Sequence, residues 1–297
     1  MSISPQKTTV GFIGIGVMGN SMATHILNGG YSLHVYTRTA YKADALVRQG
    51  ATLHDSPKEL AAACDVVITM VGYPHDVEEV YLQPDGLLAN ARQGAYFIDM
   101  TTSSPQLAQR IYKESAARGL HALDAPVSGG DIGAREAKLS IMIGGDKEAC
   151  DTLLPLLGLM GSNIVYQGQA GAGQHTKMCN QIAIASNMMG VCEALAYAKS
   201  SGLDPASVLK SIESGAAGSW SLSNLGTRMI NGNFEPGFYI KHFIKDIGIA
   251  LQSAKEMGLQ TPGLALADSL YKQLAELGYD EKGTQALYLY YTGQADS

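Results

Sequence analysis

The sequence predicts a doubly wound α/β domain over residues 1–166, followed by an all-α domain over residues 167–297. Three observations support this division. Up to residue 166, short apolar runs of strand length alternate with helical patterns, which is typical of a sheet covered by helices. Beyond it only helical patterns follow, and a long apolar helix at about residues 170–199 joins the two parts. A length of 297 residues also suits two domains of roughly 100–200 residues each.

The composition restricts the classes of function. Hydrophobic residues make up 46% of the chain and charged residues 16%, so surplus apolar surface can be buried in a homodimer or homotetramer. The net charge of −6 and the absence of long lysine and arginine runs argue against nucleic acid or an anionic membrane as partner. The sequence shows neither a signal peptide nor an apolar run of ~18 residues, so we expect a soluble cytoplasmic protein.

The cysteines and histidines suggest neither a disulfide framework nor a metal site. The four cysteines lack Cys-x-x-Cys spacing, which predicts reduced thiols. The seven histidines are scattered along the chain, without the spacing of metal ligands. We therefore expect no metal at the functional site.

The first strand–helix turn carries the most specific motif. An apolar strand, Val10–Ile13, runs into Gly-Ile-Gly-Val-Met-Gly and then into a helical pattern. Gly14 permits the tight turn, Gly16 lets the backbone approach a pyrophosphate, and Gly19 lets the helix pack closely on the strand. The helix N-terminus adds free N–H groups and a partial positive charge. The motif predicts a dinucleotide-binding turn made by Gly14, Gly16, Val17, Met18 and Gly19.

The end of the second predicted strand, Leu33–Tyr36, bears on the choice of cofactor. An NAD-preferring site usually places an acidic residue here, which accepts a hydrogen bond from the ribose 2′-hydroxyl. This sequence has Thr37, Arg38 and Thr39 instead. The Arg38 guanidinium can pair bidentately with a 2′-phosphate, although a solvated surface arginine would give the same sequence. The pattern favours NADP and leaves NAD as the alternative.

Two further strands end in residues that can face a bound cofactor, because ligands of such sheets lie at the carboxyl ends of the strands. One strand, Asp65–Met70, leads to Val71 and Gly72, and the next, Ala95–Asp99, leads to Thr102. We expect Ser104, two residues further on, to cap the following helix.

The segment Ser128-Gly129-Gly130 offers another polar feature. Two glycines after a serine expose successive backbone N–H groups, which suits the binding of a carboxylate. An ordinary glycine-rich turn has the same composition, and the spacing alone does not decide between the two interpretations.

The start of the long helix carries a cluster of polar residues. The loop before it, residues 168–173, is rich in glycine, and its spacing predicts a closely packed hinge rather than a second dinucleotide turn. Lys177, Asn180 and Gln181 stand at i, i+3 and i+4 and therefore share one helical face. Polar groups on one face of an otherwise apolar helix suggest an active site. The alternative is a lysine that extends to solvent.

The rest of the chain is predicted to be helical. A long helix over residues 239–257 carries Lys245 and Asp246, and we expect Asp280 to cap the last helix, which ends near Tyr291. We expect no salt bridge between Lys245 and Asp246, because adjacent helical residues do not face each other.

Four motifs occur in the order found in one enzyme family. They are the glycine turn of residues 14–19, Asp124-Ala-Pro-Val-Ser128-Gly129-Gly130, the glycine-rich loop that leads to Lys177 and Asn180, and Lys245-Asp246. Together they resemble the β-hydroxyacid dehydrogenase family, which includes 3-hydroxyisobutyrate dehydrogenase, tartronate semialdehyde reductase and small glyoxylate or succinic semialdehyde reductases. Some relatives carry the asparagine one place later, so the residue that orients substrate is either Asn180 or Gln181.

The resemblance implies a Rossmann-type N-terminal domain, an all-α C-terminal domain and a long helix that joins them. It also implies an NAD(P)-dependent oxidoreductase that transfers hydride between nicotinamide and a small 3-hydroxyacid or semialdehyde, or a 2-oxoacid such as glyoxylate. Lys177 would be the catalytic acid and base. The residues implied to contact the substrate carboxylate, the substrate or the cofactor are Ser128, Gly129, Gly130, Asn180, Gln181 and Lys245.

The chemistry suits a lysine at this position. Reduction of a carbonyl leaves a developing alkoxide, which an ammonium group stabilises and protonates; in the reverse direction the neutral amine accepts the hydroxyl proton. Two alternatives remain. In the related imine reductases the lysine position commonly holds another residue, and a non-catalytic nucleotide sensor would not need Lys177, Ser128 and Asn180 together. Only one arginine follows Arg135, so a small substrate suits the chain better than a phosphogluconate.

Overall fold

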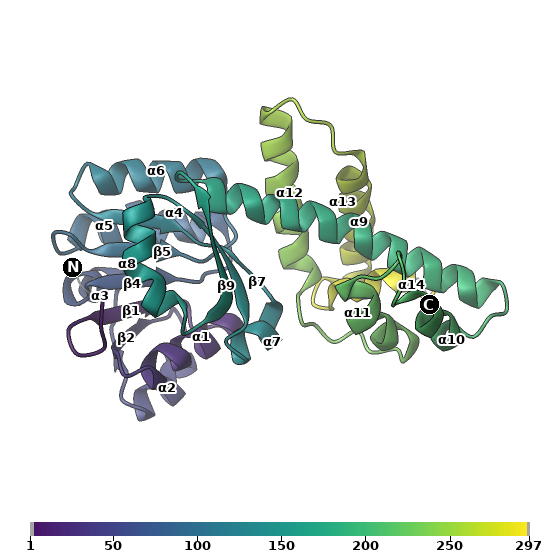
Figure 1. Cartoon of the computed structure of the whole chain (residues 1–297), viewed down its shortest axis with the longest axis horizontal. Helices are drawn as coiled ribbons and strands as arrows, with labels where there is room; N and C mark the ends of the chain where they lie inside the picture. The colour runs from purple at the N-terminus through teal and green to yellow at the C-terminus, as the bar shows by residue number, and fades with distance from the viewer. Residues whose placement is uncertain (1–2, 296–297) are drawn as a thin grey trace. The chain divides into compact units, whose positions relative to one another are not determined.

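In the computed structural model, which describes residues 3–295, the chain divides into two compact units between Lys177 and Met178. The first unit contains a nine-stranded sheet with helices, and the second is helical. Helix α9, Ala172–Ser200, belongs to both (Figure 1). The predicted order of a doubly wound α/β part, a long helix and an all-α part is confirmed.

The sheet has the strand order β3-β2-β1-β4-β5-β6-β8-β7, and β9 pairs with β8. The strands from β3 to β6 are parallel, whereas β8 is antiparallel to β6 and β7. The carboxyl ends of β1, β2, β4 and β5 therefore meet at one edge. The strands are β1 (Thr9–Ile13), β2 (Ser32–Tyr36), β3 (Thr52–Leu53), β4 (Val66–Thr69), β5 (Tyr96–Asp99), β6 (His121–Asp124), β7 (Val127–Ser128), β8 (Leu139–Gly144) and β9 (Gly161–Gly168).

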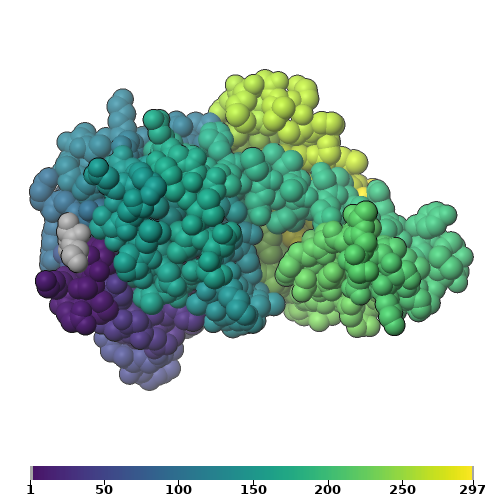
Figure 2. Space-filling view, in the orientation of Figure 1, coloured from purple at the N-terminus to yellow at the C-terminus, as the bar shows by residue number. Residues whose placement is uncertain are grey.

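Helices cover both faces of the sheet (Figure 1). The side chains of β4 alternate between two cores: Val66 and Ile68 pack with α1, α2 and α8, whereas Val67 packs with α3 to α6. In the space-filling view, α8 and β9 (teal) hide the strands behind them (Figure 2). The helices are α1 (Val17–Asn28), α2 (Asp44–Arg48), α3 (Pro57–Ala63), α4 (Pro74–Leu82), α5 (Leu87–Asn90), α6 (Pro105–Ala116), α7 (Gly130–Arg135) and α8 (Lys147–Leu157), with a 3-10 turn at Ala40–Ala43.

The second unit packs its helices around one apolar core, to which Phe243, Ile247 and Tyr271 contribute fully buried side chains. Its helices after α9 are α10 (Pro205–Ile212), α11 (Trp220–Ile230), α12 (Ile240–Glu256), α13 (Pro262–Leu274) and α14 (Leu287–Tyr291). The expectation that Asp280 caps the last helix is wrong. A π turn at Ala275–Tyr279 and a 3-10 turn at Thr284–Ala286 come between, so α14 begins directly after Ala286.

The cysteines of the described residues are unpaired: Cys179 is exposed, and the other three are buried. Burial raises the pKa of the Cys64 thiol to about 12. Ser104 caps α6 as expected, because its hydroxyl accepts a hydrogen bond from the Leu107 N–H. Among residues 3–295 no helix is long and apolar enough to cross a membrane, and no group of three His, Cys, Asp or Glu residues could hold a metal ion.

Candidate active site

The turn after β1 has the shape that a dinucleotide needs. Gly14 has φ +99°, and a Cβ there would lie 2.2 Å from the Met70 carbonyl oxygen. A Cβ on Gly19 would lie 1.9 Å from the Gly14 carbonyl oxygen, so α1 packs on the strand only with glycine at this position. At Gly16 no described atom beyond its immediate chain neighbours lies within 4 Å of the place a Cβ would take, which leaves room for a phosphate. The first N–H groups of α1, which begins at Val17, can bind it.

The loop after β2 lies at the neighbouring strand end. The Arg38 side chain is 73% exposed, and its Nη1 lies 2.9 Å from Oδ1 of the buried Asp76. Thr37 and Thr39, on either side, are half-buried. Asp76 is in the first turn of α4, where its Oδ2 accepts a hydrogen bond from the Tyr73 N–H at 3.0 Å. Arg38 is therefore an exposed cation whose place is set by a buried carboxylate.

The ends of β4 and β5 are tied together by hydrogen bonds. The Val71 N–H donates to Thr101 Oγ1 at 3.0 Å, and the Thr101 N–H donates to Asp99 Oδ1 at 3.1 Å. The same Asp99 oxygen accepts a hydrogen bond from Thr69 Oγ1 at 2.8 Å. Val71 and Thr102, both predicted to contact the cofactor, are thus held at neighbouring strand ends.

Asp99 gives this region a pH dependence. Burial raises the pKa of its carboxyl from 3.8 to about 6, against the opposing effect of its hydrogen bonds. Because the folded pKa is the higher one, the protonated carboxyl stabilises the fold at low pH, and this contribution is lost as pH rises through about 6. We expect the free energy of unfolding of wild type, relative to Asp99→Asn, to fall by about 2 kcal/mol between pH 4.5 and 7.5.

Urea denaturation of both proteins at the two pH values measures this change. The asparagine variant has no titrating group at the position, so subtraction removes the contributions of all other groups. A difference between the two proteins that stays constant with pH would contradict the raised pKa of Asp99.

Lys177 lies beside the segment Ser128–Gly130. Its Nζ donates a hydrogen bond to the Val127 carbonyl oxygen at 2.8 Å, and the residue is 7% exposed. Gly129 and Gly130 have φ values of +129° and +63°, in the region that favours glycine. The structure therefore brings the predicted catalytic lysine to the predicted carboxylate-binding segment, although the two are about 50 positions apart in the sequence.

The carboxylate of Asp124 fixes the start of α9. Its two oxygens accept hydrogen bonds from the Gly171 N–H at 2.7 Å and from the Gln174 N–H at 2.8 Å. Burial raises the pKa of Asp124, and these N–H groups partly offset the shift. Gly173 packs too closely for a side chain, since its Cβ would lie 2.4 Å from the Met142 carbonyl oxygen.

Gln174 makes a second connection, to the loop after β5. Its Oε1 accepts a hydrogen bond from the Ser103 N–H at 2.9 Å, and its Nε2 donates to the Thr101 carbonyl oxygen at 2.8 Å. The residue is fully buried. Gln174 therefore joins the loop that carries Thr102 to the helical turn directly before Lys177.

In the second unit, the other predicted side chains are connected to Asp246 by hydrogen bonds and an ion pair. Asn180 Nδ2 donates to Gln181 Oε1 at 2.7 Å, and Gln181 Nε2 donates to Asp246 Oδ2 at 2.6 Å. Lys245 Nζ lies 2.8 Å from Asp246 Oδ1, an ion pair without the alignment of a good hydrogen bond. The expectation of no salt bridge here is wrong. The rule for adjacent helical residues concerns the directions of the Cβ atoms, and the long lysine stem bends back to the buried carboxylate.

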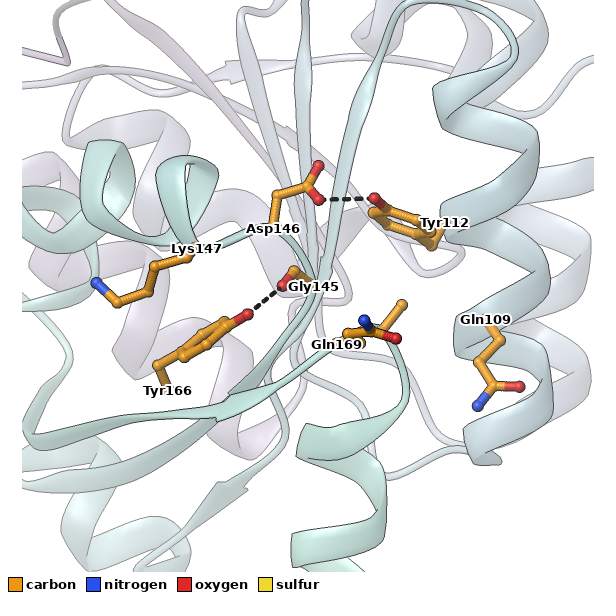
Figure 3. A pocket seen from close by; sticks show the side chains of 8 residues that line it. Gln109, Tyr112, Gly145, Asp146, Lys147, Tyr166 and Gln169 are labelled. Atoms are coloured by element: carbon orange, nitrogen blue, oxygen red, sulfur yellow. Dashed lines mark hydrogen bonds between the residues drawn. The ribbon is translucent and has the colours of Figure 1, made fainter.

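A hollow in the first unit lies beside the start of α9 (Figure 3). Polar groups of its lining form hydrogen bonds with one another: the Tyr112 hydroxyl donates to Asp146 at 2.6 Å, and the Tyr166 hydroxyl donates to the Gly145 carbonyl oxygen at 2.9 Å. Its described lining contains none of the predicted site residues, so we assign neither cofactor nor substrate to it. The lining residues are Gln109, Tyr112, Gly145, Asp146, Lys147, Tyr166, Gln169 and Ala170.

Comparison with known proteins gives two family matches. Residues 9–168 match the NAD binding domain of 6-phosphogluconate dehydrogenase, and residues 171–291 match the NAD-binding domain of NADP-dependent 3-hydroxyisobutyrate dehydrogenase. The chain is 39% identical to 2-hydroxy-3-oxopropionate reductase of Escherichia coli, over 94% of this chain and 95% of the relative. The chain belongs to the 3-hydroxyisobutyrate dehydrogenase family. It is an NAD(P)-dependent oxidoreductase of hydroxyacids, as its resemblance implied.

Other members of the 3-hydroxyisobutyrate dehydrogenase family are similar over the same span. An uncharacterised oxidoreductase of Bacillus subtilis is 61% identical over 95% of this chain and 98% of its own. The solved structure of Mycobacterium tuberculosis 3-hydroxyisobutyrate dehydrogenase with L-serine has a TM-score of 0.88 at 30% identity, and the match covers 95% of this chain and 98% of that chain.

In this family member, sequence reasoning assigned no role to five polar residues that hold the predicted ones in place, although Asp124 and Asp246 stand in two of the family motifs. They are Asp76, Asp99, Asp124, Gln174 and Asp246. Asp99 and Asp124 do carry a signal, because each is the last residue of a buried strand, where polar side chains face the ligand edge. Asp246 follows Lys245 in a family motif, whereas Asp76 and Gln174 lie in helices among other polar residues and no local pattern distinguishes them.

Proposed function

We propose that the protein transfers hydride between NADP and a small carboxylate-bearing hydroxyacid or semialdehyde, with Lys177 as general acid and base. The hydrogen bond from Lys177 Nζ to the Val127 carbonyl oxygen carries the proposal, because it aims an ammonium group at the segment that begins with Ser128. The names of two relatives agree with this class of substrate: 2-hydroxy-3-oxopropionate and 3-hydroxyisobutyrate each bear a carboxylate and an oxygen function at carbon 3.

Different residues of the chain would bind the cofactor, bind the substrate and transfer the proton. The bound dinucleotide supplies or accepts the hydride, and the glycine turn would hold its pyrophosphate. The backbone N–H groups of Gly129 and Gly130, with the Ser128 hydroxyl, would bind the substrate carboxylate. This contact would place the substrate oxygen near Lys177, whose Nζ donates a hydrogen bond to the Val127 carbonyl oxygen. Lys177 would protonate the developing alkoxide in reduction and accept the hydroxyl proton in oxidation.

Asn180 is the better candidate than Gln181 for orienting the substrate. Gln181 is 1% exposed, and its amide donates to Asp246, so it is committed to the protein. Asn180 is half-buried, and Gln181 fixes its amide group. Asp246 also holds Lys245, which would then approach the substrate or cofactor as a fixed cation.

Two observations support NADP over NAD. The loop after β2 presents an exposed arginine and no acidic residue, and the family description for the second half of the chain names an NADP-dependent enzyme. A guanidinium matches a phosphate with paired N–H donors.

We also propose a homodimer or homotetramer. Large apolar side chains of the second unit are exposed in the single chain, among them Tyr197 at 75%, Trp220 at 64% and Met257 at 61%. A second copy of the chain is the partner we expect to bury them. Light scattering at micromolar concentration should give at least twice the mass of 31.4 kDa, and a monomer mass would contradict the proposal.

Initial rates test the proposed reaction. The carbonyl substrates are glyoxylate, succinic semialdehyde, 2-hydroxy-3-oxopropionate and methylmalonate semialdehyde, each with NADPH and NADH. We expect turnover of at least one of them, faster with NADPH. If none is reduced while the protein still binds NADPH, the proposal is wrong, and an imine reductase or a nucleotide sensor becomes the better interpretation.

A further inference from the structure

We infer that Asp76 positions Arg38 for the cofactor and thereby sets the preference for a 2′-phosphate over a 2′-hydroxyl. The inference rests on the proposed function, in which Arg38 binds the 2′-phosphate of NADP. It starts from the contact of 2.9 Å between Arg38 Nη1 and Asp76 Oδ1. We treat Asp76 as a positioning residue, since it would act on the cofactor only through Arg38.

The ion pair spans the strand end at which a dinucleotide binds. Arg38 follows β2, and Asp76 is in the first turn of α4, which follows β4. β2 and β4 lie on either side of β1 and parallel to it. The pair therefore reaches across the carboxyl end of β1, directly beside the turn that begins at Gly14. In sheets of this kind the ribose nearest the first turn lies at the end of the second strand.

Asp76 holds its place independently of Arg38. Its side chain is 5% exposed, and Oδ2 accepts the hydrogen bond from the Tyr73 N–H in a capping box. The N-terminus of α4 favours a negative charge at this position. His75 Nε2 lies 3.6 Å from Oδ1, on the same side as Arg38. The carboxylate is therefore a fixed anchor, and the exposed arginine is the mobile partner.

Fixing the position of Arg38 favours a cofactor with a 2′-phosphate over one with a 2′-hydroxyl. An exposed arginine has many rotamers, and a guanidinium held at one nitrogen loses less conformational freedom when its remaining donors meet a phosphate. The carboxylate also repels a phosphate, but the Tyr73 N–H and the helix terminus offset its charge. NADH lacks the 2′-phosphate, so its binding should not depend on the place of Arg38.

The variant Asp76→Asn tests the inference on the full chain. Asparagine keeps an oxygen for the Tyr73 N–H and loses the charge that holds Arg38. Titration followed by nucleotide fluorescence gives the Kd of NADPH and of NADH. We expect NADPH to bind about 5- to 20-fold more weakly and NADH to change less than about twofold. The control Glu78→Gln removes an ion pair of 2.6 Å with Arg110 from the same helix and should change neither Kd.

Arg38→Ala and the double variant separate the inference from the proposed function. If Arg38→Ala leaves the Kd of NADPH unchanged, the proposed role of Arg38 fails, and the inference fails with it. If Arg38→Ala weakens NADPH but Asp76→Asn does not, only the inference is overturned. Equal weakening of NADPH and NADH by Asp76→Asn would indicate damage to α4, and tighter NADPH would indicate repulsion; both overturn it. We expect the double variant to bind NADPH no more weakly than Arg38→Ala.

Discussion

Lys177→Ala should lower kcat by about 10²- to 10⁴-fold, the usual contribution of a positioned acid or base. The variant loses the only group we assign to proton transfer, while the glycine turn and Arg38 stay in place. We therefore expect the Kd of NADPH to change less than about twofold. Steady-state rates in both directions, together with a cofactor titration, measure the two effects separately.

The control is Lys199→Ala, which removes an exposed lysine from the last turn of the same helix. Its kcat should match that of wild type. Lys177→Arg keeps the positive charge but cannot act as a base, because arginine stays protonated at accessible pH. We expect it to remain impaired in oxidation of the hydroxyacid. Unchanged rates in Lys177→Ala would rule out the assigned role.

Asp246→Ala should lower the free energy of unfolding by about 3–5 kcal/mol, because it removes the carboxylate that pairs with the buried Lys245 ammonium. The Lys245 side chain is 13% exposed, so it has little access to water in place of the carboxylate. The Gln181 amide also loses its acceptor. We further expect kcat/KM to fall about 10²-fold, because Asn180, Gln181 and Lys245 all depend on this carboxylate for their orientation.

Urea denaturation measures the stability, and rates are taken at a temperature where the variant is folded. Glu281→Ala is the control: it removes the ion pair with Lys241, in the first turn of the same helix. The Glu281 side chain is 62% exposed, so its loss should cost less than about 1 kcal/mol. Equal losses of stability in the two variants would contradict the expectation that the buried Asp246 carboxylate contributes more to the free energy of unfolding than the exposed Glu281 carboxylate.

The residues that could be predicted from the sequence belong to local patterns. The residues of the turn at Gly14 and those of the polar face of α9 each lie within a few positions of one another in the sequence. The pattern of apolar residues predicts the strands of the sheet. Asp124, Gln174 and Asp246 act through partners between 47 and 73 positions away, which no window of the sequence contains. Their burial and their hydrogen bonds exist only once the fold has formed.

Smaller differences in the fold have equally local causes. The segment Val127–Ser128 is too short for a recognisable strand, so the antiparallel pairing of β7 with β8 was not expected. Near Asp280 the helical pattern is interrupted by Gly278, with φ +90°, and the chain forms a π turn and a 3-10 turn before α14. An N-cap residue type alone does not show where a helix begins.

The hydrogen bonds of Asp124 also bear on how the chain matures as it is synthesised. A nascent chain that has emerged as far as residue 170 contains all nine strands of the sheet. It still lacks the Gly171 and Gln174 N–H groups, so the carboxylate at the end of β6 has neither of these donors. The Ser103 N–H and the Thr101 carbonyl oxygen likewise lack these hydrogen bonds until the Gln174 side chain is present. These donors and acceptors come from the first turns of a helix that belongs mostly to the next unit, so the hydrogen bonds of Asp124 and Gln174 can form only after synthesis has passed residue 174.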